Sequence, residues 1–417
     1  MKGPQKKKET IAADVSTKEK PCDKDHTYFG IKVNSKLNAS ASSSTTLNRA
    51  LTAENIYTAM KDSVFKYYGT KIYDKDTLRT VLYVDMSGLN TVTAANPELM
   101  GKFADATADN CLFFMPKGFA LTNMANSVAL QQDGKSYQAI GDVTLKDQQP
   151  FFTPYDFTTG QFKAVYVREG TSNGTTAKAK VKKMTSVLPF NLTLDKSGHP
   201  FNNGEPTATS YMTFFDITAF GKTVTGVRKD ETDHELTYSF IADTVRTQKA
   251  EANKPYYVKI DETGPAGFEF RIPGASFAKT PDIEGKTDDP DNLTKTNNKG
   301  DWTAHGTYNG VAPTKSEYRW YFAQDLFWKS SQLKYEHFYI RPFRAYFFTT
   351  QTTPSDAAKA GVVYDPSEIT PTGISEVQAV HVNNGRVYTI DGRYVGMSLD
   401  NLAPGLYIQN GRKVVKQ

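Results

Sequence analysis

Apolar and polar positions alternate in short runs over most of the chain, from Ser127 to about Thr350. Gly, Asn, Asp and Pro separate the runs, and almost no helical spacing occurs between them. Short alternating runs bounded by turn residues are typical of the strands of a β-sandwich. The pattern therefore predicts one or two β-sandwich-like domains over residues 119–350. The main runs are SVALQQ, YQAIGDVTL, FKAVYVRE, YMTFFDIT, LTYSFIA, YYVKI, FEFRI, YRWYFA and FRAYFFTT.

The preceding segment, 46–118, has a different pattern. Apolar residues follow helical spacing over 51–69, with Thr52 as a cap and Gly69 as a stop, which predicts a helix. The run TVLYVDMSGLNTV then predicts a buried strand and a turn like those of leucine-rich repeats, followed by a short helix and a strand over 111–115. We therefore expect a small α/β leucine-rich-repeat-like segment here.

The two ends of the chain are more polar. Residues 1–45 are rich in Lys, Glu and Asp and predict a disordered or linker tail, with one candidate strand at 26–34. Residues 351–373 are rich in Pro, Thr and Ala and predict a second linker. In 374–417, Asp-Gly and Asn-Gly each lie between two β-type runs, a strong signal for hairpin turns. The whole pattern predicts a mainly β fold that ends in a short C-terminal β meander.

Composition adds exclusions. Aromatic residues make up 12% of the chain, which favours half-buried β surfaces. The net charge of +5 is spread along the sequence, so we expect no nucleic-acid partner. No run of 18 apolar residues occurs, so no transmembrane span is expected. The start, MKGPQKKKETIAADVSTKEK, has a basic region without a following apolar one, which predicts either a cytoplasmic protein or a truncated, mature or fragmentary chain.

Catalytic and metal-binding patterns are hard to find. The six histidines have no metal-ligand spacing, and neither a phosphate-binding loop nor a nucleophile elbow occurs. Cys22 and Cys111 could form one disulfide at most, and Cys111, in NCLFFMP, is better explained as a buried strand residue than as a nucleophile. We therefore expect a protein that is not an enzyme and holds no cofactor.

Two segments keep a binding interpretation open. The carboxylates of Asp288, Asp289 and Asp291 are close enough in sequence to coordinate Ca²⁺, although a solvated loop is the preferred interpretation. Residues 316–348 carry Trp320 and Trp328 among many Tyr and Phe. These aromatics are either a sugar-stacking platform or, as we prefer, the core of a sandwich.

Trp302 lies apart from the aromatic segment. It follows Gly-Asp in the polar sequence GDWTAHGTYNG and is the aromatic least explained by packing. We therefore take Trp302 as the first candidate for a ligand contact.

Four motifs in fixed order resemble a module of large extracellular proteins of Bacteroidales bacteria. The motifs are DNCLFFMPKG (109–118), MTSVLPFNLT (184–193), EANKPYYVKI (251–260), and FRAYF (343–347) preceded by WYFAQDLFWK. Such modules tend to follow leucine-rich or other repeats, in agreement with the pattern at 80–115.

The end of the chain is similar to the sorting domains of the type IX secretion system. Together with the module, the resemblance covers roughly residues 80–417. The tail unit, at about 44 residues, is shorter than a full sorting domain, so a surface location is better supported than this particular export route. The positions that match the tail pattern are Val387, Tyr388, Gly392, Arg393, Val395, Gly405, Tyr407, Ile408, Gly411, Lys413 and Val414.

The resemblance implies a non-enzymatic structural or adhesive protein that is secreted or lies on the outer-membrane surface. Its expected partners are secretion or attachment machinery and a host or dietary glycan or protein. The alternative is a carbohydrate-binding accessory protein that stacks Trp302, Trp320 or Trp328 on sugar rings. Bacteria of this group attach O-glycans at Asp-Ser/Thr-aliphatic triplets, and three triplets fit, which gives Ser63, Thr77 and Thr244 as candidate glycosylation sites.

Overall fold

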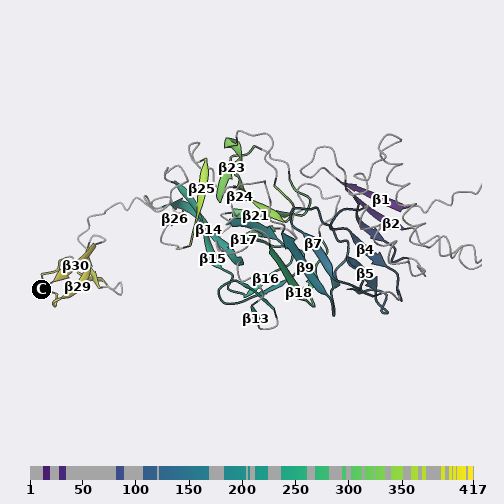
Figure 1. Cartoon of the computed structure of the whole chain (residues 1–417). Helices are drawn as coiled ribbons and strands as arrows, with labels where there is room; N and C mark the ends of the chain where they lie inside the picture. Colours follow the sequence, from purple (N-terminus) through teal and green to yellow (C-terminus); the bar gives the residue numbers. More distant parts are fainter. Residues whose placement is uncertain are drawn as a thin grey trace, which may run out of the picture. The chain divides into compact units, whose positions relative to one another are not determined.

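We describe the fold from a computed structural model (Figure 1). It confirms the mainly β prediction, since the described regular structure consists of strands and one 3-10 turn, η1 (Ser330–Gln332). None of the described residues belongs to a helix of the length and apolarity needed to cross a membrane. The described residues are 13–18, 28–33, 81–88, 107–119, 122–168, 183–202, 205–206, 212–223, 236–260, 268–280, 294–296, 302–311, 315–323, 325–333, 340–350, 358–364, 369–371, 387–389, 394–396, 398–400, 402–409 and 412–416.

The first sheet has eight strands in the order β1-β2-β3-β4-β5-β6-β8-β19. The four neighbours from β2 to β5 run parallel, whereas β1, β6 and β19 each pair antiparallel with a neighbour. Strands β3 and β4 are buried along their whole length, as expected of parallel strands covered on both faces. The strands are β1 (Ala13–Lys18), β2 (Tyr28–Val33), β3 (Val81–Asp85), β4 (Leu112–Met115), β5 (Ser127–Leu130), β6 (Tyr137–Ala139), β8 (Phe157–Thr158) and β19 (Ser276–Phe277).

The largest sheet has eleven strands, in the order β10-β17-β14-β15-β25-β23-β22-β24-β21-β20, with β26 paired to β14. All of its register-defined pairs are antiparallel except β15 with β25. The strands are β10 (Lys183–Val187), β14 (Met212–Thr223), β15 (Tyr238–Thr244), β17 (Pro255–Ile260), β20 (Thr294–Thr296), β21 (Trp302–Thr307), β22 (Arg319–Ala323), β23 (Leu326–Lys329), β24 (Arg344–Thr349), β25 (Lys359–Val363) and β26 (Ile369–Pro371).

Two smaller sheets complete the main unit, which extends to Thr370. One has three strands in the order β18-β9-β7, and the other has four in the order β13-β12-β11-β16. Figure 1 shows β7, β9 and β18 side by side. The strands are β7 (Val143–Lys146), β9 (Lys163–Arg168), β18 (Phe268–Pro273), β11 (Leu192–Leu194), β12 (Pro200–Asn202), β13 (Glu205–Pro206) and β16 (Lys249–Ala250).

The large sheet curls so that its first strand, β10, meets strands near its other end. The Thr185 hydroxyl donates to the Ala345 carbonyl at 3.0 Å and accepts from the Ala345 amide at 2.9 Å. The Val187 amide donates to the Phe343 carbonyl at 3.2 Å. Gly306 of β21 permits this approach, because a Cβ there would lie 3.0 Å from Val187 Cγ2.

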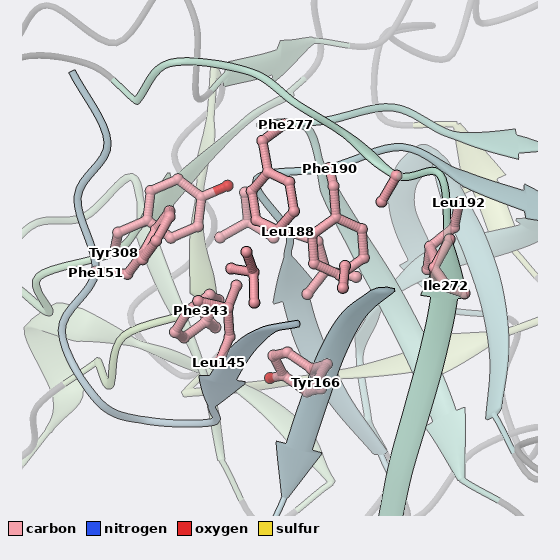
Figure 2. Close-up of a cluster of buried hydrophobic side chains, with 14 of the residues drawn as sticks. Leu145, Phe151, Tyr166, Leu188, Phe190, Leu192, Ile272, Phe277, Tyr308 and Phe343 are labelled. Carbon is pink, nitrogen blue, oxygen red and sulfur yellow. The ribbon is translucent and has the colours of Figure 1, made fainter. Parts of the chain in front are cut away.

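Two hydrophobic cores result from this arrangement. The larger one joins the eight-stranded sheet to the smaller sheets, and Figure 2 shows part of it around Tyr166, Leu145 and Phe343. Aromatic rings there meet mostly edge to face, as for Tyr166 and Phe343 at 5.6 Å between centroids, a favoured geometry. The second core lies on one face of the curled sheet, where Phe240 of β15 contacts Trp320, Phe327 and Phe347.

Two predicted domain boundaries do not match the structure. Strand β4 lies before the predicted boundary at 118/119 and β5 lies after it, but the two pair directly in one sheet. The predicted linker over 351–373 is wrong for residues 359–363, which form β25 between β15 and β23. Ala360 and Val363 are fully buried, so this segment is part of the core. The helix predicted over 51–69 and most of the 1–45 tail lie outside the described residues.

Residues Pro371–Gln417 form a second compact unit. Its four strands are β27 (Val387–Thr389), β28 (Tyr394–Gly396), β29 (Gly405–Gln409) and β30 (Arg412–Lys416). Both predicted hairpins are present, and Gln409 pairs with Arg412 on either side of Asn410-Gly411. The strand order β28-β27-β29-β30 is not that of a simple meander, because β27 rather than β28 pairs with β29.

Candidate functional site

The first ligand candidates from the sequence, Trp302 and Trp320, are core residues. Their side chains are 1% and 0% exposed, and both lie in the core of the curled sheet. The Trp320 indole donates to the Thr349 hydroxyl at 3.2 Å, and Trp302 packs 5.4 Å from Phe347. The expectation that these two rings stack on a sugar is therefore corrected, because neither ring has a face open to solvent.

The opposite face of the same sheet carries a second set of aromatic residues. His305 is directly opposite Tyr346, Tyr346 is opposite Tyr321, Tyr321 is opposite Trp328, and Trp328 is opposite Lys359. Directly opposite residues point to the same side of a sheet, so the five side chains form one line across β21, β24, β22, β23 and β25. We call this line the aromatic row.

The middle of the aromatic row is covered. Tyr321 is fully buried and Tyr346 is 8% exposed, beneath Ile340 and the partly buried Val311 and Leu333. The two ends, in contrast, are half-buried. Any ligand on this face would therefore meet the ends of the row rather than its middle.

Trp328 and Lys359 form one end. The Lys359 ammonium lies 4.6 Å from the centre of the Trp328 ring, within the range of a cation–π contact. The Trp328 indole donates to the Ala323 carbonyl at 2.9 Å, which fixes the orientation of the ring. Trp328 is thus the one tryptophan of the three predicted contacts that reaches the surface.

His305 forms the other end, and Phe348 of β24 and Arg319 of β22 lie beside it on the same face. The Arg319 guanidinium lies 4.7 Å from the Phe348 ring centre and 5.2 Å from that of Tyr346. The His305 ring is stacked on Tyr346 at 5.4 Å and meets Phe348 edge-on at 5.0 Å. Two aromatic rings therefore contact the planar cation, and the imidazole packs against both rings.

A different polar cluster lies in the eight-stranded sheet, at the end of β3. The buried Asp85 carboxylate accepts from the Ser87 hydroxyl at 2.6 Å and from the Tyr155 hydroxyl at 2.7 Å. Tyr137 donates to Ser87 at 3.1 Å, and its ring is stacked on Tyr155 at 4.5 Å. Burial and the bond to Asp85 raise the pKa of Tyr155. Because all these groups point toward one another, we interpret the cluster as a structural connection of β3 and β6 with the turn at Ser87 and the segment before β8.

The remaining sequence candidates have varied positions. Cys111 is a buried free thiol whose pKa is raised by burial, which agrees with a structural role. Thr244 is half-buried at the end of β15. The candidate calcium ligands Asp288, Asp289 and Asp291, and the candidate glycosylation sites Ser63 and Thr77, lie outside the described residues. Within the described part of the chain, no three His, Cys, Asp or Glu side chains are grouped as metal ligands.

The module motifs that lie apart in sequence are close together in the fold. MTSVLPFNLT contains most of β10, EANKPYYVKI contains β17, and FRAYF contains most of β24. Strand β10 pairs with β17 and is hydrogen-bonded to β24 through Thr185. DNCLFFMPKG contributes β4, in the eight-stranded sheet.

The tail motif also comes together. Tyr388 of β27 is paired with Ile408 of β29, and Val387 is fully buried. Tyr407 is paired with Val414 of β30, next to the pair formed by Ile408 and Lys413. Val395 lies in β28 and Gly405 begins β29. Gly392, Arg393 and Gly411 lie outside the described residues.

Sequence reasoning missed three residues at or beside the half-buried ends: Arg319, His305 and Lys359. A signal was available in the alternation of RWYFA and WTAHGT, where Arg319 and Tyr321 must face away from Trp320, and His305 away from Trp302. Comparison with protein-family models, curated proteins and solved structures gives no match.

Proposed function

We propose that this chain is a non-enzymatic structural or adhesive protein of the bacterial surface or exterior, and that its C-terminal unit serves export or attachment. The observation that carries the proposal is the separate compact unit Pro371–Gln417, with a sheet of its own. The two halves of the sorting-like motif are joined in it by the pairing of β27 with β29. A separate unit of this kind is suited to recognition by export or attachment machinery.

The large β unit supports the structural part of the proposal. Its strands are covered by two extensive aromatic cores, and β10 is fixed to β24 through buried hydrogen bonds. A rigid β-rich body can space or display a binding region.

A location experiment tests this proposal. The full chain, a form ending at Thr370 and a Val387→Asp variant would be expressed in a Bacteroidales host with an active type IX system. We expect surface labelling of whole cells for the full chain only, because Val387 is the buried centre of the tail sheet. Ser398→Ala, in a loop outside the motif, is the matched control and should be labelled normally. Recovery of the native protein from the cytoplasm alone would overturn the proposal.

Glycan binding is the second candidate function, and Trp328 favours it. The ring is half-buried, its orientation is fixed, and it is accompanied by a cation. Aromatic rings at a surface with polar groups beside them are suited to hold sugars. A glycan array with the full chain, Trp328→Ala and the core-face control Phe322→Leu would test this candidate. Phe322 is partly buried like Trp328 but packs against the core on the opposite face, so its variant controls for the loss of a ring in the sheet. Glycan signals that disappear only in Trp328→Ala are expected, and the absence of any signal would remove this candidate.

A further inference from the structure

Arg319 has an unusual position in the large sheet. It is in β22, directly opposite Phe348, on the face that carries the aromatic row. Its guanidinium is held between the rings of Phe348 and Tyr346 at 4.7 and 5.2 Å. The side chain is therefore ordered by the sheet itself, before any partner binds.

Arg319 is also a cation without a counter-charge. In the part of the chain that the structure describes, its one hydrogen bond is from Nη1 to the Tyr321 hydroxyl at 3.3 Å, and it makes no ion pair. The Nε–H is buried and has no acceptor. Two other cations of the large sheet are paired with acids: Lys329 lies 2.7 Å from a Glu317 oxygen, and Arg344 is paired with Asp147.

A guanidinium in this state is prepared to bind an oxyanion. Its planar fork matches the two oxygens of a carboxylate or sulfate, and it is more weakly hydrated than an ammonium group. Stacking on aromatic rings removes much of the side-chain freedom that binding would otherwise have to restrict. The Nη2 group makes no hydrogen bond among the described residues and is not buried, so it supplies donors that such an oxyanion would satisfy.

We propose that Arg319, with the rings of Phe348 and Tyr346 beneath its guanidinium, is a subsite for the carboxylate or sulfate groups of an acidic polysaccharide. This inference rests on glycan binding, the second candidate function above. The rings of Phe348 and Tyr346 border the cation, and Trp328 with Lys359 repeats the pairing of ring and cation in β23 and β25. Arg319 is in β22 and Trp328 is in its neighbour β23, one strand spacing of about 5 Å away, so a single sugar chain can contact both groups.

The sheet favours a sugar chain over an acidic peptide. Peptides often bind by adding a strand to a sheet edge, but β22 is paired on both sides, with β23 and β24. The face therefore offers rings and cations rather than free backbone groups.

The test uses the full chain in calorimetric titrations with four probes: polygalacturonate, chondroitin sulfate, neutral dextran and poly-glutamate. We expect binding of one or both acidic polysaccharides and at least about tenfold weaker binding by Arg319→Gln, the loss of one charge-assisted bond. Arg319→Lys keeps the charge but loses the fork and should also weaken binding. Arg246→Gln, which removes an exposed arginine paired with Asp243, is the matched control and should bind normally. Thermal unfolding of each variant checks its fold.

The outcomes separate this inference from the glycan function. Polygalacturonate and chondroitin sulfate distinguish a carboxylate from a sulfate ligand, and binding of either through Arg319 supports the subsite. Equal binding by Arg319→Gln and the unchanged chain, or an equal loss in Arg246→Gln, would overturn it. Poly-glutamate bound through Arg319 as tightly as the polysaccharides would replace it with a general acidic-polymer site. Dextran bound through Trp328 and indifferent to Arg319 would keep glycan binding and remove the anion subsite. No binding of any probe would remove both.

Discussion

At the scale of single residues, the buried carboxylate of Asp147 is in contact with two arginines and a tyrosine hydroxyl. Arg344 donates to both of its oxygens, Tyr166 donates its hydroxyl, and Arg168 Nε lies 3.6 Å away. Burial alone would raise the pKa of Asp147, but the two arginines and the donated hydrogen bonds outweigh it and hold that pKa below its ordinary value. The cluster connects β7 and β9 of the small sheet to β24 of the large one.

Stability should therefore fall in acid through Asp147. The pKa of Asp147 is about 3.9 in the unfolded chain and lower in the folded one. The contribution of Asp147 to folding stability is therefore complete above about pH 4 to 5, and it is lost as the pH falls through the folded pKa. Asp147→Asn leaves two buried arginines uncompensated and should lower the free energy of unfolding by about 3–5 kcal/mol at neutral pH. Below about pH 4 the difference between the variant and the unchanged chain should be smaller, because Asp147 itself becomes protonated there. Urea unfolding between pH 2 and 7 measures both effects. Asp109→Asn, at an exposed pair with Lys146, should change stability by about 1 kcal/mol or less; an equal loss there would contradict this account.

Gly141 shows how backbone packing restricts one position. A Cβ at Gly141 would lie 2.2 Å from the carbonyl oxygen of Met124, whose own amide donates to Ile140. Gly141→Ala must displace backbone and should destabilise the chain by about 2 kcal/mol or more. Gly134, in an open turn with φ of 69°, should cost only about 1 kcal/mol when changed to Ala, because strain is the whole effect. Equal midpoints of urea unfolding for the two variants would refute the steric explanation.

At the scale of the element, strand alternation decides which aromatic residues are core and which face outward. Trp320 and Tyr321 are adjacent in β22 but belong to different clusters on opposite faces of the sheet. The same alternation in β21 places Trp302 in the core and His305 beside Tyr346. A polar sequence around a tryptophan is therefore compatible with complete burial of its ring.

Two tryptophan substitutions should separate the faces. Trp320→Ala removes a fully buried ring and its bond to Thr349, and should cost about 3–5 kcal/mol. Trp328→Ala removes a half-buried ring and should cost clearly less. The cation–π contact with Lys359 that it also removes is partly exposed to solvent and therefore contributes little to stability. Chemical unfolding followed by circular dichroism compares the two variants. A larger loss in Trp328→Ala would mean that the assignment of the faces is wrong.

At the scale of the whole molecule, the main unit ends later in sequence than its composition suggests. Strand β25 closes the gap between β15 and β23, and its Val362 and Val363 are buried. The two hydrophobic cores contain residues before Pro371 only. The C-terminal unit, by contrast, has its own sheet.

Truncation should reproduce this division. A chain ending at Thr370 should unfold cooperatively at a midpoint within a few degrees of the full chain, because its cores are intact. A chain ending at Thr350 lacks β25 and should lose cooperative unfolding, since two neighbouring strands lose their partner. Differential scanning calorimetry of the two forms makes the comparison. Equal stability of both would show that β25 is dispensable and would restore the linker interpretation of 351–373.

The sequence by itself determined the fold class, the positions of most strands between Ser127 and Thr350, and the two hairpins of the tail, because these depend on local alternation and turn residues. It did not determine that 359–363 is a core strand, because the run is short and lies among Pro, Thr and Ala, and because the strands that it pairs with, β15 and β23, are distant in sequence. Only the tertiary structure decided which strands are neighbours. Register across β21, β24, β22, β23 and β25 depends on pairings far apart in sequence, and that register separates buried Trp302 from half-buried Trp328 and leaves Arg319 without a counter-charge.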